Sequence, residues 1–337
     1  MDQSFSDLSR LSESEALSML ADIGRNLVLG GGSRLSPVFL VSMVLICAAI
    51  WVTRKPGQGF WAWAFPRRVY ATRSFVVDLQ LWLLSIALRA VGFFSLVAFA
   101  PALTNALQTF LAGDTAPNST WPPLVIGALM LCALDGAGYW VHRLFHEIPR
   151  LWPFHAVHHS AEQLNPVTLF RKHPVYNLLA SLVHSLVTGI LQGLLLGLLI
   201  GKVEVATLMG VNLFYYAFNL AGANLRHTHI WLSWGPVLEH LFISPAQHQV
   251  HHSINPRHFN KNYGEVLAIW DWAFGTLYVP KQREALEFGL ADMRGNRISQ
   301  PHGTLRAALV EPVVTALSPR KRKTRAREGR LGPGGKS

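Results

Sequence analysis

The chain has 337 residues but few cysteines and few charges. Its two cysteines, Cys47 and Cys132, each lie inside an apolar run, so neither a disulfide framework nor a thiolate metal site is available. Only 15% of the residues are charged, 50% are hydrophobic, and the mean hydropathy is +0.25. An ordinary soluble domain does not carry such an apolar excess. The composition therefore predicts a membrane protein.

Several signatures are also missing. No basic start or small-residue cleavage site precedes the first apolar run, at 36–52, so we interpret this run as a retained span and not as a signal peptide. The zincin motif H-E-x-x-H is incomplete, because Ile148, Pro149 and Arg150 follow His146-Glu147. The sequence contains no dinucleotide-binding fingerprint and no haem-binding cytochrome b5 signature. These absences argue against a zinc hydrolase and against a built-in electron donor.

The net charge of +11 does not indicate nucleic acid binding. The basic residues concentrate in short loops and in a C-terminal run at 320–327. Basic runs beside apolar spans contact anionic lipid head groups or set the topology of the chain. We therefore expect a membrane, and no nucleic acid, as the partner of these charges.

The apolar runs predict a multi-pass helical protein. An amphipathic surface helix is expected at 7–29, ahead of the first span. The last two runs are separated by only four residues, 201–204, and this break predicts a helical hairpin that returns to the same side of the membrane. The expected spans are 36–52, 75–100, 122–141, 177–200 and 205–221.

Loop charges predict the sidedness of these spans. The loop at 53–74 carries five arginines and lysines, whereas the segment 101–121 carries none. The positive-inside rule places the first loop in the cytoplasm and the second outside it. Counting crossings from there brings every histidine cluster to the cytoplasmic side. Four regions follow, namely a surface segment at 1–34, a transmembrane region at 35–121, a catalytic domain at 122–280 and a basic, partly disordered tail at 281–337.

Three histidine clusters are the most informative feature of the chain. An H-x-x-H-H cluster at 155–159 recurs at 248–252, and a pair at 142 and 146 precedes the first. Side chains at i, i+3 and i+4 share one helical face, so each cluster can converge on one site, and two adjacent histidines lie far enough apart to address two metals. Imidazole suits iron, zinc, copper and nickel. The clusters predict a two-metal centre that includes His142, His146, His155, His158, His159, His248, His251 and His252.

Further polar residues near the clusters are candidates for roles around the metals. We expect His173 and His227 to be additional ligands and His229 to be a possible one. Asp135 lies on the same helical face as His142, where it either orients an imidazole or makes a polar contact within the membrane. Arg171 and Lys172 either bind an anionic head group or only set the loop topology. The remaining histidines, His184, His240, His258 and His302, are expected to lie outside the centre.

These motifs resemble the fatty acid hydroxylase superfamily, also called the sterol desaturase family, of integral membrane di-iron enzymes. The resemblance covers about 135–279 and includes the three clusters, the 224–227 element and the segments 260–264 and 270–276. The first cluster has three intervening residues, as in the sterol and alkylglycerol branches. Some fatty acyl 2-hydroxylases have a longer interval there.

The resemblance implies an all-α fold, an integral membrane helical bundle with a cytoplasmic, histidine-rich helical cap. The cap would hold two irons through the clustered histidines, with His173 and His227 as further ligands, and Asp135, Tyr139, Asn224 and Asp271 would lie behind them. The implied reaction uses O2 and two electrons to hydroxylate, or to desaturate, a C–H bond of a lipid. The electrons would come from a donor in trans, a reductase with cytochrome b5 or ferredoxin.

The resemblance leaves the lipid open, since relatives act on sterols, fatty acyl chains, ether lipids, carotenoids and aminolipids. Hydroxylation is favoured over desaturation. Two other classes remain as alternatives, a histidine-rich membrane protein that binds or transports metal and a zinc-dependent membrane hydrolase. A bis-histidine haem protein would need facing histidines inside the spans.

Overall fold

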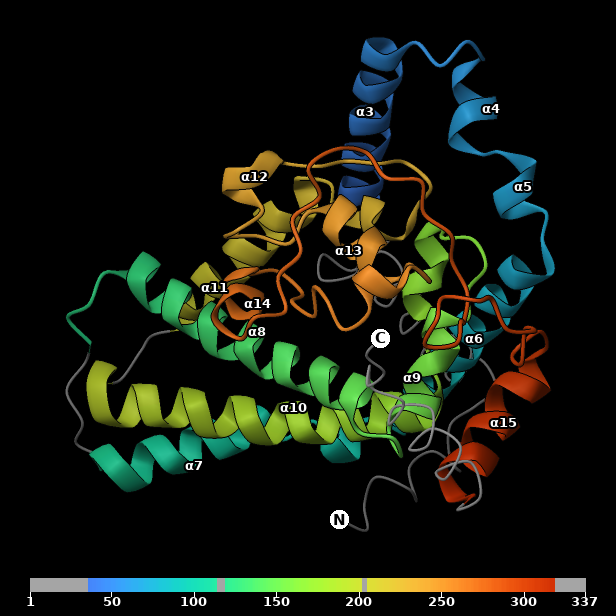
Figure 1. Ribbon diagram of the computed structural model, residues 1–337. Helices are drawn as coiled ribbons and strands as arrows, with labels where there is room; N and C mark the ends of the chain where they lie inside the picture. The colour runs from blue at the N-terminus through green and yellow to red at the C-terminus, as the bar shows by residue number, and fades with distance from the viewer. Residues whose placement is uncertain (1–35, 114–118, 202–204, 319–337) are drawn as a thin grey trace, which may run out of the picture.

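The computed structural model describes residues 36–113, 119–201 and 205–318, which form helices and connecting loops (Figure 1). Within these ranges there is no β-strand, only isolated bridges such as the one between Phe242 and Leu267. The predicted all-α fold is thus confirmed. The expected surface helix at 7–29 and the basic run at 320–327 lie outside the described residues.

Among the described residues, three helices are long and apolar enough to cross a membrane. They are α3 (Pro37–Arg54), α8 (Pro123–Glu147) and α10 (Pro174–Leu195), which a π-helical turn at Leu196–Ile200 extends. These helices agree with three of the expected spans and have the composition of an integral membrane protein. The shorter α11 (Val205–Leu220) occupies the fourth, and it packs on α8, which also packs on α10. The two arms of the expected hairpin therefore both contact α8.

The expected span at 75–100 is wrong. Helix α6 (Arg73–Ala90) ends ten residues earlier, and the chain turns through Gly92, whose φ is 72°, into the short η1 (Ser95–Val97) and then α7 (Ala100–Ala112). Hydropathy alone does not reveal this turn, because the residues around Gly92 are as apolar as those of a span. Helix α6 also meets the segment 60–70, formed by α4 (Phe60–Ala64) and α5 (Arg67–Tyr70), at an angle of 85°.

Helix α7 runs parallel to α10, because Leu103, Leu107 and Leu111 face Gly189, Gly193 and Gly197 in that order. The chain thus runs along α7 away from the end of the bundle that carries the histidine clusters. It returns to that end along α8 and leaves it again along α10 (Figure 1). At about 1.5 Å per residue, 13 residues of α7 span roughly 20 Å, less than the apolar core of a bilayer. Small residues every fourth position allow such close helix packing.

We expect Gly193→Leu to separate α7 from α10. A β-carbon at Gly193 would lie 2.7 Å from Cβ of Leu107 and 3.2 Å from the carbonyl oxygen of Thr104. Overpacking of this kind costs about 1–3 kcal/mol, so the melting temperature of the detergent-solubilised protein should fall. Ala106→Leu, a change of similar size on the exposed face of α7, is the control. Equal melting temperatures for the two variants would refute this packing.

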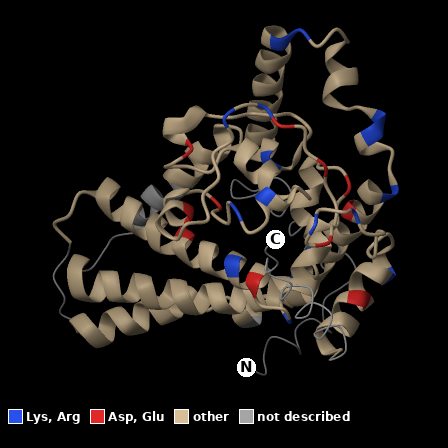
Figure 2. Cartoon of the chain, in the orientation of Figure 1, with Lys and Arg blue, Asp and Glu red and all other residues tan. Residues whose placement is uncertain are grey.

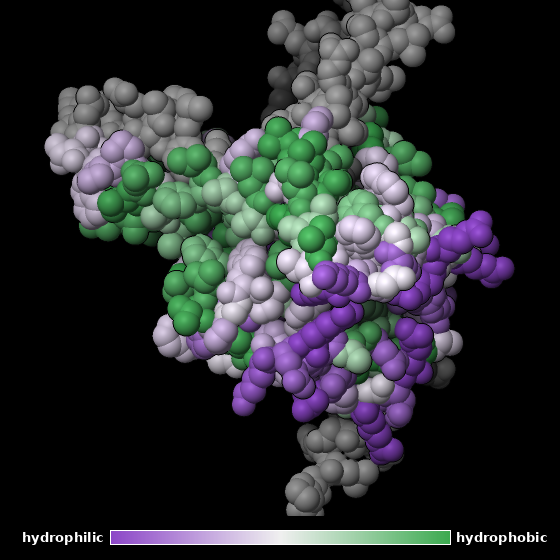
Figure 3. All heavy atoms as spheres, turned by 90° about the horizontal axis from the view of Figure 1, so that it is seen from above, coloured by the Kyte–Doolittle hydropathy of each residue, from purple (hydrophilic) through white to green (hydrophobic). Residues whose placement is uncertain are grey.

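The remaining helices form a cap at the end of the bundle where α8 finishes and α10 begins (Figure 1). Most of the charged side chains in the described ranges lie in the cap, whereas the arm of α7, α10 and the first half of α8 has none (Figure 2). Figure 3 shows polar side chains gathered on one side of the molecule and apolar ones over the arm. The cap elements are α9 (Trp152–His159), η2 (Pro166–Phe170), η4 (Ala223–His227), α12 (Gly235–Leu238), α13 (Pro245–His251), η5 (Pro256–His258), α14 (Ile269–Ala273) and α15 (Leu305–Leu317).

A buried ion pair joins the cap to α6. The guanidinium of Arg171 lies 2.9 Å from the carboxylate of Asp78, and both side chains are fully buried. Arg171 also donates hydrogen bonds to the carbonyl oxygens of Val157 and His302. Of the two roles expected for Arg171, head-group binding is therefore wrong, because the side chain has no access to solvent or lipid.

The segment after 280 is less peripheral than expected. Ala308 of α15 is fully buried against Val77 and Leu81 of α6 and Val157 of α9. This contact places α15 directly behind the helix that carries the first H-x-x-H-H cluster. The described part of the expected tail, up to 318, thus supports the cap.

Candidate metal centre

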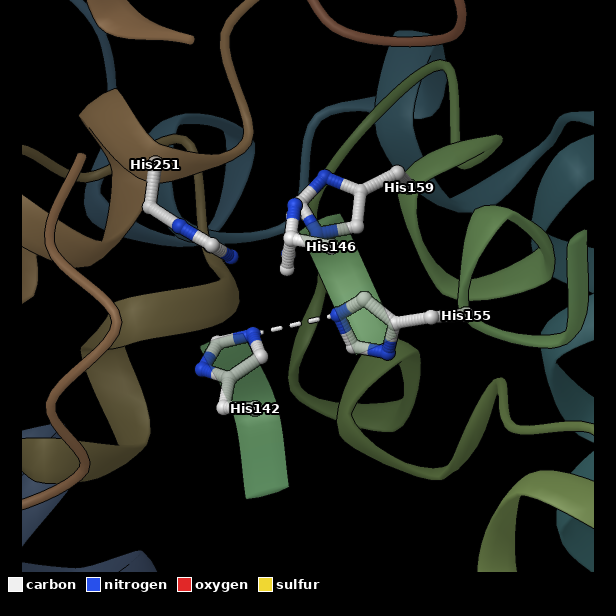
Figure 4. Close-up of side chains that lie close together, drawn as sticks. All are labelled: His142, His146, His155, His159 and His251. Atoms are coloured by element: carbon white, nitrogen blue, oxygen red, sulfur yellow. Dashed lines mark hydrogen bonds between the residues drawn. The ribbon is translucent and has the colours of Figure 1, made fainter. Parts of the chain in front are cut away.

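Nine histidines from four elements converge in the cap as two adjacent groups. Each histidine offers one nitrogen, and within a group these nitrogens all lie within 4.8 Å of one another. The first group is shown in Figure 4, with the imidazoles turned toward a common centre. It contains His142, His146, His155, His159 and His251, and the second group contains His158, His227, His248 and His252.

Local sequence explains how each cluster is presented. Helix α8 continues beyond the apolar run for two turns and carries His142 and His146 on one face. Helix α13 starts with a capping box, in which the Ser244 hydroxyl accepts from the Gln247 amide (3.1 Å) and the Gln247 side chain accepts from the Ser244 amide (2.9 Å). In both α9 and α13, adjacent histidines point to different groups, so each short helix serves both. The rings of His159 and His252 stack at 4.4 Å between the groups.

Burial keeps six of these imidazoles in the neutral form. The cost of desolvating a charge is the largest cause of the lowered pKa values, and neighbouring imidazoles add to it for most of them. A neutral imidazole carries the lone pair that a metal requires. Among the histidines outside the membrane helices, the pKa lies well below the usual 6.5 for His155, His158, His159, His248, His251 and His252.

The nitrogen geometry fits metal ions. Nε2 of His142 lies 3.0 Å from Nε2 of His155, and Nε2 of His227 lies 3.0 Å from Nε2 of His248. Two nitrogens bound at right angles to one metal at about 2.1 Å would be about 3 Å apart. In the first group, Nε2 of His146, His159 and His251 is buried and has no hydrogen-bond partner. Each unpaired buried group costs about 1–3 kcal/mol, a cost that bound metal would offset.

Main-chain carbonyls orient two of the imidazoles. Nδ1 of His142 donates to the carbonyl oxygen of Tyr263 (2.7 Å), and Nδ1 of His251 donates to that of Lys261 (2.8 Å). A carbonyl only accepts, so the proton must sit on Nδ1 and Nε2 is left with its lone pair. Sequence reasoning identified the 260–264 segment by resemblance but not this role, because main-chain contacts leave no signal in side-chain identity.

Asp271 holds that segment in place. Its carboxylate accepts from the amides of Tyr263 (2.8 Å) and Gly264 (2.7 Å) and from the hydroxyl of Thr276 (2.6 Å). A β-carbon at Gly264 would lie 2.5 Å from the carbonyl oxygen of Leu267, so only glycine fits. Asp271 therefore acts on His142 through the Tyr263 peptide and does not touch the imidazole itself.

Two of the other residues expected behind the ligands, Asp135 and Tyr139, form hydrogen bonds with groups other than imidazoles. The carboxylate of Asp135 accepts from the amides of Val266 (2.9 Å) and Leu267 (3.0 Å), and it contacts no imidazole by hydrogen bond. The hydroxyl of Tyr139 lies 3.0 Å from that of Thr276, in the turn held by Asp271. Asn224 lies in η4, the element that carries His227.

Two of the expected ligands lie outside both groups. Nδ1 of His173 accepts from the Val175 amide (3.0 Å) and Nε2 donates to the Leu309 carbonyl (3.0 Å), so both nitrogens are occupied. His173 caps the start of α10 and is not part of either group. Nε2 of His229 donates to the Trp63 carbonyl (2.8 Å), outside the groups as well. His184, His240, His258 and His302 are also outside, whereas His227 belongs to the second group.

One aromatic residue beside the centre was missed. The Tyr176 ring stacks on His155, with centroids 4.8 Å apart and an interplanar angle of 26°, and it also packs on Phe145 at 4.5 Å. Tyr176 follows His173 by one helical turn, at the start of an apolar run, and this position was the sequence signal that could have placed its ring near the centre.

Comparison with known proteins agrees with this geometry. A sequence profile of the fatty acid hydroxylase family matches residues 127–276, which include all nine histidines. The chain is 33% identical to an alkylglycerol monooxygenase of Danio rerio over 164 residues, which are 48% of this chain and 32% of that protein. It is 30% identical to an ornithine lipid hydroxylase of Rhizobium tropici over 170 residues, 50% of this chain and 47% of the relative.

A third relative aligns over a longer stretch. A Delta(7)-sterol 5(6)-desaturase of Aspergillus fumigatus is 25% identical over 233 residues, 64% of this chain and 71% of the relative. The chain thus spans about a third of the alkylglycerol monooxygenase and about half of the ornithine lipid hydroxylase. No solved structure matches the chain. The segment 127–276, with the two histidine groups that it carries, belongs to the fatty acid hydroxylase family.

Proposed function

We propose that the protein is a membrane-bound di-iron oxidoreductase that uses O2 and two electrons to hydroxylate, or to desaturate, a C–H bond of a lipid. The observation that carries this proposal is the pair of adjacent, largely buried histidine groups at the end of apolar helices. The named activities of the relatives, lipid hydroxylation and sterol desaturation, support the same reaction class.

The donor set fits two irons. Each group provides only imidazole nitrogens, which suit iron and exclude the oxygen-ligated magnesium and calcium. The five-histidine group would hold one iron and the four-histidine group the other, and His173 and His229 are left out of the proposed ligand set. When bound, the irons would supply the activation of O2 that attack on an unactivated C–H bond needs.

The protein itself would orient the metal ligands and exclude water from the site. The carbonyls of Tyr263 and Lys261 fix Nε2 of His142 and His251 toward the centre, and Asp271 and Asp135 hold the segment that contains Tyr263. Eight of the nine histidines are buried and His146 is partly exposed, and this burial would keep bulk water from the reacting carbon. The lipid would enter from the bilayer beside α8 and α10.

The partners and the sidedness are part of the proposal. The five basic residues between 53 and 74 support a cytoplasmic cap. Electrons would arrive there from a donor in trans, a reductase with cytochrome b5 or ferredoxin. The family match lies inside the segment 122–280, which we propose as the catalytic domain.

The proposal is tested by untargeted mass spectrometry of lipids from host cells that express the intact protein or the His155→Ala, His251→Ala double variant. We expect a lipid that gains one oxygen, or loses two hydrogens, only with the intact protein. Both proteins must be folded and supplied with reductase and ferredoxin. Identical lipid profiles under those conditions would refute the oxidative function and favour metal binding or hydrolysis.

Deletion of 320–337 is expected to leave the iron content unchanged, because every residue of the two groups lies between 142 and 252. The measurement is iron per chain by inductively coupled plasma mass spectrometry on the purified full-length and truncated proteins. Loss of metal from the truncated protein would contradict this expectation.

A further inference from the structure

Arg89 is a cation without a protein partner in an apolar part of the chain. It lies in the last turn of α6, among the residues first expected to form a span. In the part of the chain that the structure describes, its side chain makes no hydrogen bond and no ion pair. Arg89 is exposed beside the apolar arm, so its guanidinium is available to an anionic ligand.

A cavity of about 540 Å³ lies in front of Arg89. Its volume is in the range of sites that hold small molecules and lipid head groups. Apolar side chains such as Phe94, Ala98 and Ala180 form part of the wall, where the start of an acyl or alkyl chain can lie. The polar part of the wall includes Arg89, Lys172, Asn177, Ser181, His184 and Glu265.

The cavity adjoins the candidate metal centre. Tyr176 lines it, and the Tyr176 ring also stacks on His155, at 4.8 Å between centroids. Val141 also lines it and directly precedes His142. Nζ of Lys172 lies 5.4 Å from the centroid of the Tyr176 ring. Tyr176 therefore borders both the cavity and the candidate metal centre.

We propose that Arg89 and Lys172 bind the anionic group, a phosphate or a carboxylate, of the head group of the lipid substrate. This inference rests on the proposed lipid oxidation and names the substrate class of the same site. Guanidinium and ammonium groups form charge-assisted hydrogen bonds with both anions. The cavity holds these two cations against one carboxylate, Glu265, which can accept from a hydroxyl or ammonium of the same head group.

The test compares two lipids that differ only in the phosphate. Oleoyl lysophosphatidic acid and monoolein are titrated into the full chain, purified in detergent with its metal, and Kd is measured by native mass spectrometry. We expect lysophosphatidic acid to bind about tenfold more tightly, a difference of about 1.4 kcal/mol. Arg89→Gln combined with Lys172→Gln should reduce the preference to less than about twofold.

The matched control replaces two exposed cations outside the cavity, Lys281→Gln with Arg306→Gln, and should keep the tenfold preference. Metal content and melting temperature show whether each variant is folded. If the double variant is unfolded, Arg89→Gln alone is compared with Arg89→Lys, and only the lysine variant should keep the preference. Equal affinity for the two lipids, or an unchanged preference in folded Arg89→Gln, would overturn the inference.

Inorganic phosphate is the third probe. We expect it not to compete with lysophosphatidic acid at equal concentration, because the apolar wall contributes to binding of the lipid. Full competition would assign the site to free phosphate and overturn the lipid assignment. Binding is measured without O2 or electrons, so its outcome is independent of whether the lipid is oxidised. Selective binding with no oxidised product would refute the proposed function and leave the anion site intact.

Discussion

His251→Ala is expected to remove the metal from the five-histidine group and to abolish lipid oxidation. His251 is buried, its Nδ1 is held by the Lys261 carbonyl, and its Nε2 has no hydrogen-bond partner. Loss of a residue that only orients a ligand lowers metal affinity about 10–100-fold, so loss of the ligand itself should have at least that effect. Iron per chain, measured on purified protein, should fall from two to one or fewer.

Two other histidines serve as controls for that variant. His240 lies outside both groups, where its Nδ1 donates to the Pro236 carbonyl at 2.5 Å. His173 caps α10 and has both nitrogens occupied. His240→Ala and His173→Ala should therefore retain two irons. Equal iron loss in His173→Ala and His251→Ala would show that the two groups do not define the ligand set.

Arg171→Met is expected to cost about 3–5 kcal/mol of unfolding free energy, because it leaves the buried Asp78 carboxylate unpaired. The same change removes hydrogen bonds to α9 and to the segment before α15. We expect the folded protein to lose metal as well, since α9 carries three of the histidines. Thermal and urea unfolding in detergent measure the loss of stability.

Arg143→Met is the matched control for this prediction. Arg143 pairs with Glu147 at 2.9 Å, but the side chains are 22% and 43% exposed. Exposed i, i+4 pairs contribute about 0.3–0.5 kcal/mol. If the two arginine variants lost similar stability, the buried pair would not be the link between α6 and the cap.

The histidine groups were predictable because helical spacing is a local property. The i, i+3, i+4 pattern spans only five residues. Adjacent histidines reach two different sites because successive side chains on a helix point in directions about 100° apart. His227 was also found, by resemblance to a family motif. His173, expected as a ligand, lies outside both groups at the start of α10, where a polar residue before a proline and an apolar run is a helix-start signal.

The predictions that the structure overturned concern contacts between residues that are distant in the sequence. Asp78 and Arg171 are 93 positions apart, so no local pattern joins them, and Arg171 was assigned in part to the membrane surface. The run at 75–100 satisfies the hydropathy criterion for a span, but the turn at Gly92 and the burial of Asp78 against the cap divide it. The roles of Asp135 and Asp271 depend on main-chain amides, which every sequence offers equally.

Growth of the expressing cells under ¹⁸O2, followed by mass spectrometry of their lipids, tests the proposed lipid oxidation most directly. We expect a lipid that carries one ¹⁸O atom, or one that is lighter by two hydrogens, with the intact protein and not with the His155→Ala, His251→Ala variant. A product whose new oxygen comes from water, or the same lipids in both strains, would contradict this expectation.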